Sequence, residues 1–578
     1  MKLSKILLIA VILFFITNLY FLINDFNQLP SPIYGGDTYH QLGHVQHLLS
    51  GGSWFEGYNI LDESPGYLPL FPLYVAIFAK ITGMQAMNAL LYSSLLSAIL
   101  ALLIIYFFLK KIFENEYTPV ILILLIIPVS RLLIVKYSIF TQLILMPLFY
   151  LFMYDFFKND KKKYLLAVTY GLLGIAHPIS FITASLLLVI FTVYFKKLNL
   201  QELKPVIIVI LIGVIIAQLY WFEPIFVHHI QSSENYLDWN NEDFSSTSLQ
   251  FTYFKNIIKG AFFNFFSNLP RTLLSLFSLA GLIILFFVKK NNYRLNFLYL
   301  FNLSAFLLLF HYFLTRPLLE MDLYPIRIYD MLFYFNIFLL TGLSLSTVIN
   351  HIKKYQQHIL TSSIIILLIF SFNTFQDKKE SDQWYTSAKN NLPEKLTELQ
   401  KFVLENTNVN DVFISANELS FMFNALTGRK VLNTRRAQNS PYVDMDERIL
   451  ASAIILYGNN DETRKNLIKK YNIKYLFWDQ DWIPTEYMAE NGNIKPFDPL
   501  NLFDSETKRK TLEQFNISYQ PQYTWVDPAL RGDTYKQFNI LLIIPNYKSK
   551  EQPWIDQLNP FLEEVFNFEN KTKIYKVK

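Results

Sequence analysis

The sequence predicts a polytopic α-helical membrane protein with an α/β domain at its C-terminal end. Only 17% of the 578 residues are charged and 52% are hydrophobic, whereas soluble globular proteins carry about 25% charged residues. Apolar runs of about 20 residues, the length that crosses a bilayer, recur as far as Phe372. This composition excludes a soluble enzyme, a disordered chain and a nucleic-acid partner. Because cysteine is absent from the sequence, disulfides and thiol nucleophiles are excluded as well.

The apolar runs place the predicted spans. The first run, Ile6 to Leu22, follows Lys2 and Lys5 and has no small-residue cleavage site after it, so we expect a retained signal anchor. The further runs are Met87–Leu109, Tyr117–Val135, Ile139–Phe157, Tyr164–Phe195, Leu203–Phe222, Thr272–Val288, Leu295–Leu314, Ile328–Ile349 and Ile359–Phe372.

Lysine placement orients these spans, because cytoplasmic loops are enriched in lysine and arginine. The expected cytoplasmic lysines are Lys110, Lys111, Lys158, Lys161 to Lys163, Lys196, Lys197, Lys289, Lys290, Lys353 and Lys354. This assignment requires that Tyr67 to Met84 does not cross the membrane. It also requires that Tyr164 to Phe195 crosses twice, with a turn at His177-Pro178. We therefore expect about 11 spans in a multi-pass protein of the cell membrane, with a cytoplasmic N-terminus and an external C-terminus.

The predicted domains follow from these spans. Residues 1–372 form a transmembrane domain with external loops at 24–86, 223–271 and 315–327. Residues 373–578 form an extracytoplasmic α/β domain, because strand-like runs alternate there with helical patterns. The strand-like runs are Val412–Ser415, Tyr475–Trp478 and Phe538–Ile544.

The first external loop is rich in ionisable residues. Asp37 lies at a predicted helix start, where it acts as an N-cap or as a catalytic carboxylate at the membrane boundary. Asp37, His40, His44 and His47 share one helical face by their spacing. Such a face either holds a divalent ion or is the polar side of an interfacial helix; we assign no metal from it. Asp62 and Glu63 follow, as loop charges or as accessory site residues.

Ionisable residues within spans or at their outer ends are candidates for function. Arg131 and His177 are such residues, and Arg316 and Arg327 flank a short external loop that also contains Glu320 and Asp322. Arginine binds phosphate groups well. The structural alternatives are contact of Arg131 with lipid headgroups, a buried histidine at 177, and ion pairs of the two loop arginines with the loop acids.

The first loop contains, in order, Asp37, Tyr39-His40, Leu48-Leu49, Gly51, Asp62, Pro65-Gly66 and Pro69-Leu70-Phe71. In these residues the loop resembles the corresponding loop of GT-C-fold glycosyltransferases, above all the oligosaccharyltransferase catalytic subunit and related archaeal membrane proteins. The resemblance implies two short jaw helices in this loop and makes Asp37 the catalytic or metal-binding acid.

Two departures from the oligosaccharyltransferase pattern follow along the chain. Ser130-Arg131 resembles the pair that precedes an acid-x-acid metal motif, but Lys136-Tyr137-Ser138 stands in place of the acids. Ala416, Asn417 and Glu418 replace the WWDYG motif. The cofactor therefore stays unknown, since no second acidic pair supports a divalent metal.

The expected function is the transfer of a sugar, with inversion, from a polyprenyl-phosphate-linked donor to an external protein or glycan. Membrane lipids are expected as further partners. Asp37 is the expected general base. Arg327, Arg131, His177 and Arg316 are expected at the donor phosphate, with His40, Asp62, Glu63 and Glu320 as accessory residues. The alternatives are a non-catalytic protein that binds lipid-linked glycans and a transporter or flippase.

Overall fold

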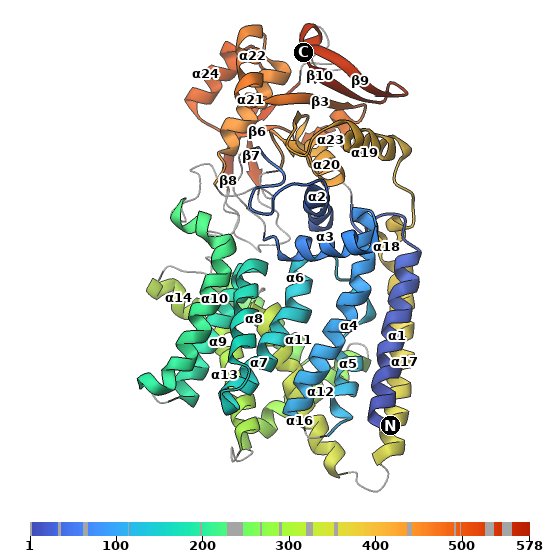
Figure 1. Cartoon of the computed structure of the whole chain (residues 1–578), viewed down its shortest axis with the longest axis vertical. Helices are drawn as coiled ribbons and strands as arrows, with labels where there is room; N and C mark the ends of the chain where they lie inside the picture. The colour runs from blue at the N-terminus through green and yellow to red at the C-terminus, as the bar shows by residue number, and fades with distance from the viewer. Residues whose placement is uncertain are drawn as a thin grey trace. The chain divides into compact units, whose positions relative to one another are not determined.

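The structure is a computed structural model. It describes residues 3–32, 36–61, 68–113, 115–196, 199–227, 247–265, 269–287, 292–319, 328–351, 356–435, 442–490, 493–496, 499–525, 537–545 and 558–578 (Figure 1). The chain forms two compact units, each built from three stretches. The helical unit comprises Met1–Phe26, Leu90–Trp221 and Ser245–Thr386. The mixed unit comprises Asn27–Ala89, Phe222–Phe244 and Ser387–Lys578.

Within the described residues, 6 helices are long and apolar enough to cross a membrane, which confirms a polytopic membrane protein. They are α1 (Leu3–Asn24), α4 (Ala86–Ile112), α6 (Tyr137–Phe140) with η2 (Thr141–Leu145) and α7 (Met146–Asn159), α9 (Pro178–Phe195), α10 (Leu200–Phe226), and η4 (Tyr329–Phe333) with α16 (Tyr334–His351). Shorter or less apolar helices are α3 (Leu70–Thr82), α8 (Lys163–Ala176), α11 (Thr247–Phe262), α12 (Leu269–Phe287), α13 (Tyr293–Leu309) and α17 (Gln356–Ser381).

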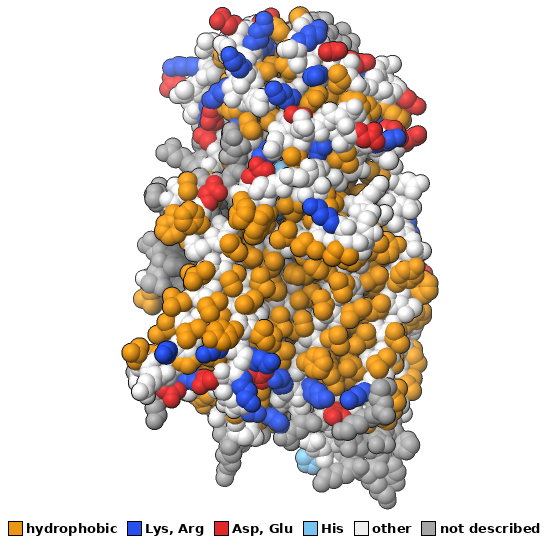
Figure 2. Space-filling model, viewed as in Figure 1, with side chains coloured by type: hydrophobic (Ala, Val, Ile, Leu, Met, Phe, Trp, Pro, Cys, Tyr) orange, Lys and Arg blue, Asp and Glu red, His pale blue; other side chains and the backbone are white. Residues whose placement is uncertain are grey.

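Ion pairs gather at one end of the helical unit. Lys111 lies 2.5 Å from Asp155, and Lys196 lies 2.6 Å from Asp160. Figure 2 shows Lys and Arg side chains at this end, below a broad hydrophobic face. Charged pairs at a helix end fit a boundary between lipid and water. The cytoplasmic assignment of this end stays a prediction.

The predicted turn at His177-Pro178 is confirmed. Helix α8 ends at Ala176 and α9 begins at Pro178, with His177 extended between them at φ −164°. The Tyr170 hydroxyl lies 2.7 Å from the Ser185 hydroxyl across the turn, so the two helices fold back on each other. Proline favours the first position of a helix and disfavours helix at the residue before it, which explains this position of the turn.

Two predicted spans are each interrupted in the structure. In the run Tyr117–Val135, helix α5 (Thr118–Ile126) stops before Pro128, and only the short 3₁₀ segment η1 (Val129–Leu132) follows. Ile127 is extended, as the residue before a proline prefers to be. The run Leu295–Leu314 divides into α13 and α14 (Tyr312–Leu319), so the predicted loop 315–327 begins as helix.

The mixed unit contains a five-stranded sheet in the order β2-β1-β3-β10-β9, in which β1 pairs in parallel with β2 and β3. Its strands are β1 (Val412–Ile414), β2 (Lys430–Val431), β3 (Ile473–Asp479), β9 (Leu562–Phe568) and β10 (Thr572–Val577). A second sheet has the order β6-β8-β7, from Asn501–Phe503, Gln537–Ile543 and Tyr519–Trp525, and β4 (Tyr487–Glu490) pairs with β5 (Asn493–Pro496). All three predicted strands are present, which confirms the α/β character.

Helices alternate with these strands along the C-terminal part. They are α19 (Glu394–Asn406), α20 (Asn417–Thr427), α21 (Met445–Tyr457), α22 (Asp461–Lys470), α23 (Trp482–Glu486) and α24 (Glu506–Gln514), and the short 3₁₀ segment η7 (Asn559–Phe561) precedes β9. Helix α18 (Gln383–Ala388) comes before them in the chain, and its Tyr385 ring packs on Phe26. The strand–helix–strand unit β1-α20-β2 matches the predicted pattern, with Gly428 in the left-handed conformation (φ 66°) ending the helix.

The first loop shares its core with this C-terminal part. Helix α2 (Asp37–Leu49) packs on α3 and on α20, as Figure 1 shows for α2 and α20. The contact between α2 and α20 is close at two glycines. A Cβ at Gly43 would lie 3.0 Å from the Asn424 carbonyl oxygen, and one at Gly428 would lie 2.4 Å from the His47 backbone nitrogen. The Val431 N–H also donates to the Asn59 carbonyl at 2.7 Å.

Candidate functional site

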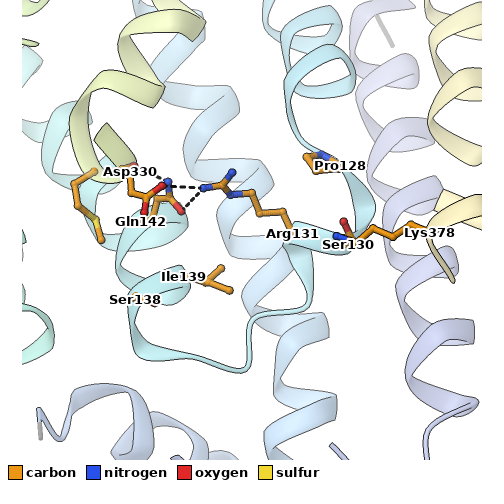
Figure 3. A pocket seen from close by; sticks show the side chains of 9 residues that line it. Pro128, Ser130, Arg131, Ser138, Ile139, Gln142, Asp330 and Lys378 are labelled. Carbon is orange, nitrogen blue, oxygen red and sulfur yellow. Dashed lines mark hydrogen bonds and ion pairs between the residues drawn. The ribbon is translucent and has the colours of Figure 1, made fainter. Parts of the chain in front are cut away.

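A cavity of about 350 Å³ lies within the helical unit. Figure 3 shows side chains from η1, η2, η4 and α17 around it. Polar and charged groups are unusual among so many apolar helices, and in a membrane protein they mark a candidate site. The lining residues are Pro128, Ser130, Arg131, Ser138, Ile139, Gln142, Asp330, Met331 and Lys378.

Two π-helical segments face each other at this cavity. Gln142 lies in η2 and Asp330 lies in η4, and the Gln142 side-chain amide donates to the Asp330 backbone carbonyl at 2.5 Å. The Tyr150 hydroxyl donates to the Met331 carbonyl at 2.6 Å. π-Helical turns are rare and occur frequently at functional sites, because the widened turn exposes backbone groups and redirects side chains. Here the two segments direct polar groups, Gln142 from η2 and Asp330 from η4, toward the cavity.

Arg131 is the cation at the centre of this cavity. Its Nη2 donates to the Gln142 side-chain oxygen at 2.8 Å and lies 3.6 Å from the Asp330 carboxylate. Its guanidinium lies over the Tyr334 ring, 4.4 Å from the ring centroid. A guanidinium has five N–H donors, and the polar contacts within the described chain use Nη2 alone. The N–H groups of Nε and Nη1 remain for an acceptor that is not part of the described protein.

Two neighbouring lysines near the end of α17 differ in their surroundings. Lys379 forms an ion pair with Asp25 at 2.5 Å. Lys378 lines the cavity, and Figure 3 shows its side chain beside Ser130, on the side away from Asp330. Among the residues that the structure describes, Lys378 has no ion pair. Helix α17 packs against η1 here, and the Tyr385 hydroxyl of the following helix α18 donates to the Ser130 carbonyl at 3.5 Å.

His177 has a structural role at the turn between α8 and α9. The Ser180 N–H donates to its Nδ1 at 3.4 Å, which caps α9, and its ring stacks on Tyr137 with 5.5 Å between centroids. The side chain is buried, and it is not among the residues that line the cavity. Its assignment to a donor phosphate stays a prediction.

Asp37 is the first residue of α2 rather than its N-cap, which corrects the capping hypothesis. The N-cap is Gly36, at φ 117°, and no side chain of the described residues caps the helix. A Cβ at Gly36 would lie 2.4 Å from the Ser31 hydroxyl oxygen, so glycine fits this position. The carboxylate of Asp37 in the first turn instead complements the helix dipole, and the residue is half-buried in the mixed unit.

The three histidines of α2 are buried, so they do not form the polar face of an interfacial helix. His44 stacks on Tyr58 with 4.4 Å between ring centroids, and His40 meets the same ring edge-on at 5.0 Å. His47 Nδ1 donates to the Gly428 carbonyl at 3.0 Å. Burial lowers the pKa of His40 to about 3 and the pKa of His44 well below its usual value. These side chains are therefore neutral near pH 7.

The structure does not support a metal at either candidate position. Across the described ranges, no group of three or more His, Cys, Asp or Glu side chains is arranged to hold a metal ion. Around the cavity the described lining contains one carboxylate, Asp330, which is already paired with Arg131. Hard divalent ions prefer several oxygen ligands. The residues present do not fit the metal site that the resemblance implies, and we derive no step through a metal.

The remaining predicted site residues are placed only in part. Arg327, Asp62, Glu63 and Glu320 lie outside the described residues. Arg316 is in α14, and its side chain is not described. Asp37 belongs to the mixed unit, whereas Arg131 and His177 belong to the helical unit.

Of the residues that line the cavity, the sequence selected Arg131 as a site residue and missed others, among them Gln142, Asp330 and Lys378. Asp330 is an acid inside the predicted span Ile328–Ile349, and this signal was sufficient to mark it as a candidate. Gln142 gave no such signal, because a neutral amide in an apolar run is common. Lys378 follows the predicted end of the last span, where lysine is expected at a surface.

A buried ion pair occupies the place of the missing WWDYG motif. Glu418, in the first turn of α20, is fully buried, and both of its carboxylate oxygens pair with the guanidinium of Arg435. Arg435 also lies over the Phe421 ring, 4.5 Å from its centroid. The segment is therefore part of a packed core.

The fold defines the chain as a polytopic α-helical membrane protein with a C-terminal α/β domain. It belongs to the same family as the uncharacterized protein MJ1080 of Methanocaldococcus jannaschii. The two are 34% identical over 103 residues, which cover 18% of this chain and 76% of that protein. No protein-family model matches the chain.

Three solved structures illustrate what the chain is similar to. The oligosaccharyltransferase of Archaeoglobus fulgidus in its apo form is 12% identical, with a TM-score of 0.47 over 98% of this chain and 79% of that chain. The arabinofuranosyltransferase AftD from Mycobacteria is 13% identical, with a TM-score of 0.48 over 95% of this chain and 40% of that chain. ArnT from Cupriavidus metallidurans, bound to undecaprenyl phosphate, is 10% identical, with a TM-score of 0.42 over 99% and 97%. All three are GT-C-fold proteins, the superfamily that the first loop resembles.

Proposed function

We propose that the protein is a membrane glycosyltransferase that transfers a sugar, with inversion, from a polyprenyl-phosphate-linked donor to an external protein or glycan. One observation carries the proposal. Arg131 is held by Gln142, Asp330 and Tyr334 at a cavity within the helical unit, and within the described residues its Nε and Nη1 donors are left for a ligand. The resemblance of the first loop to GT-C glycosyltransferases supports the same class.

The chemistry of Arg131 favours an anionic headgroup. Hydrogen bonds between a guanidinium and a phosphate oxygen are charge-assisted and about twice as strong as neutral ones. The contacts with Gln142 and Asp330 fix the side chain before a ligand arrives, which reduces the entropy lost on binding. A lipid-linked phosphate is an anion that enters such a site from the bilayer.

The transfer step that we propose is a single displacement. The acceptor hydroxyl or amide attacks the anomeric carbon of the sugar, and the bond from that carbon to the phosphate oxygen breaks. The electron pair stays on the phosphate oxygen, and the acceptor proton passes to the Asp37 carboxylate. Attack from the opposite side inverts the anomeric carbon. Arg131 offsets the charge on the leaving phosphate; Arg327, Arg316 and His177 are proposed to assist it.

A transfer assay tests this proposal. Purified protein is given polyprenyl-monophosphate and polyprenyl-diphosphate sugars with candidate peptide and glycan acceptors. We expect Asp37→Asn to lower kcat by about 10²–10⁴, the usual contribution of a general base. We expect Arg131→Gln to reduce transfer as well, because it removes the guanidinium from the cavity. Asp504→Asn, which alters an acid outside both candidate sites, is the control.

The outcomes separate the proposal from its rivals. Unchanged transfer in Asp37→Asn would refute the role of Asp37 as base. Binding of lipid-linked sugar without transfer, for every donor and acceptor, favours the non-catalytic alternative. Movement of the intact donor across a vesicle membrane, again without transfer, favours a flippase.

A further inference from the structure

A second cation reaches the cavity that contains Arg131. Lys378 comes from α17 and Arg131 from η1, two segments far apart in the sequence, and both line the same space. Figure 3 shows Arg131 directed toward Gln142 and Asp330, and Lys378 beside Ser130. Asp330 is paired with Arg131, and the described chain offers Lys378 no acid of its own. The ammonium of Lys378 therefore remains available to an anion.

The charges of the described lining restrict the anion that fits. Arg131 and Lys378 are positive and Asp330 is negative, which leaves one net positive charge. The hydroxyls of Ser130 and Ser138 line the same cavity. A sugar joined to a polyprenol through one phosphate is a phosphodiester with a single negative charge, and a diphosphate link has two. The lining thus balances the monophosphate and leaves the diphosphate with uncompensated charge.

We infer that this cavity binds the monophosphate group of a polyprenyl-monophosphate sugar, and that Lys378 is a phosphate-binding residue beside Arg131. The inference rests on the proposed function and specifies its donor. When the bond between the anomeric carbon and the phosphate oxygen breaks, the phosphate gains a second negative charge. Lys378 offsets that added charge, so it contributes to the transition state as well as to binding.

Lys378 also has a structural effect that its neighbour shares. Both Lys378 and Lys379 lie in the last turn of α17, where cations stabilise a helix by complementing its dipole. Lys379 is paired with an acid, Asp25, whereas Lys378 has no acid partner among the residues that the structure describes. Lys379→Gln therefore removes the helix-end charge without changing the cavity, and it is the matched control for Lys378→Gln.

The binding experiment uses the full chain in nanodiscs of a zwitterionic lipid. The probes are polyprenyl-phospho-glucose and polyprenyl-diphospho-glucose of equal chain length. We expect the wild type to bind the monophosphate more tightly than the diphosphate. Lys378→Gln should weaken monophosphate binding about tenfold, the effect of losing one charge-assisted hydrogen bond. Lys379→Gln should change it less than about twofold, and Lys378→Arg should retain binding.

Several outcomes would overturn the inference. These are equal affinity in Lys378→Gln and the wild type, equal losses in the two lysine variants, or tighter binding of the diphosphate probe. A further arm adds phosphatidylglycerol, whose phosphodiester also has a single charge. If this lipid displaces the donor one for one, the site binds ordinary headgroups and the inference fails. Unfolding temperatures of the variants must match, so that lost binding is not lost folding.

Failure of the inference is distinguishable from failure of the proposed function. If the wild type transfers sugar and Lys378→Gln transfers it equally well, the inference fails and the glycosyltransferase stands. If the wild type prefers a diphosphate donor and transfers from it, the donor class alone is wrong. If the wild type neither binds nor transfers from any polyprenyl carrier, both proposals fall.

Discussion

Three neutral histidines on α2 make the stability of the mixed unit depend on pH. Burial lowers the pKa of His40, His44 and His47 below the usual value. A group whose pKa is lowered by folding stabilises the folded state above its unfolded pKa, about 6.5 for histidine. As pH falls from about 6.5 toward the folded value, which is about 3 for His40, the unfolded chain binds protons that the folded chain does not.

We therefore expect the protein to lose stability below pH 6.5. Each histidine that stays neutral when folded contributes a slope of about 1.4 kcal/mol per pH unit. The measurement is the free energy of unfolding of the mixed unit between pH 7.5 and 5, followed by tryptophan fluorescence. His44→Phe keeps the ring that stacks on Tyr58 and removes one titrating group, so its slope should be shallower. A slope equal to that of the wild type contradicts the assignment.

The buried pair of Glu418 and Arg435 is a second feature at the scale of single residues. Glu418→Ala leaves the half-buried guanidinium of Arg435 without its carboxylate. We expect a loss of about 3–5 kcal/mol in the free energy of unfolding, as for other broken buried pairs. The double variant with Arg435→Leu should recover part of this loss, because it removes the unpaired charge. If the loss in unfolding free energy of the double variant equals the sum of the losses of Glu418→Ala and Arg435→Leu alone, the two residues do not act as a pair.

Close crossings at glycines hold α2 against α20. Gly428 and Gly83 both end a helix in the left-handed conformation, with φ near 66° and 71°. A Cβ at Gly428 would lie 2.4 Å from the His47 backbone nitrogen, whereas a Cβ at Gly83 meets no atom of the described residues within 4 Å. The two positions therefore form a matched pair that separates backbone strain from a steric clash.

We expect Gly83→Ala to cost only the left-handed strain, about 1–2 kcal/mol. Gly428→Ala should cost a further ~1–3 kcal/mol, because α2 must move away from α20 to accept the methyl group. Thermal unfolding of both variants measures the difference. Resistance of the α2 segment to proteolysis should fall in Gly428→Ala alone. Equal losses of stability in the two variants would mean that α2 and α20 can accept the added methyl group without cost.

Elements whose ends are set by local residues could be predicted from the sequence, whereas elements that depend on contacts between distant helices could not. The turn at His177-Pro178 was predictable, because the lysine pattern required two crossings in a short run and proline favours a helix start. The break before Pro128 rests on the same property of proline, but an apolar run of full length concealed it. The π-helical segments that contain Gln142 and Asp330 depend on contacts between distant helices. Local sequence patterns do not predict contacts between distant helices, so this part of the candidate site could not be predicted.

At the scale of the whole molecule, the first loop and the C-terminal residues form one folding unit. The apolar side chains Leu42 and Val45 of α2 are fully buried, and α2 packs on α20, which lies more than 300 residues further along the chain. We expect residues 387–578, expressed alone, to expose the α20 face that α2 covers and to aggregate. Joining residues 27–89 to this fragment by a flexible linker should restore a cooperative unfolding transition. Calorimetry and sedimentation of both fragments measure this. Cooperative unfolding of the shorter fragment alone would contradict the expectation.

The arrangement of the mixed unit also affects the order of events during synthesis. Helix α2 leaves the ribosome early, but its partner α20 follows only after the spans from Leu90 to Thr386 have been made. At about 5–20 residues per second, roughly 300 residues take on the order of 15–60 s. Throughout this interval the side of α2 that packs on α20 lacks that partner, and only α3 is present to pack on α2. A chaperone at the membrane, or the lipid surface itself, must cover this side of α2 until translation reaches α20. The nascent chain should therefore depend on chaperones or lipid more than a protein in which elements that pack together are synthesised in succession.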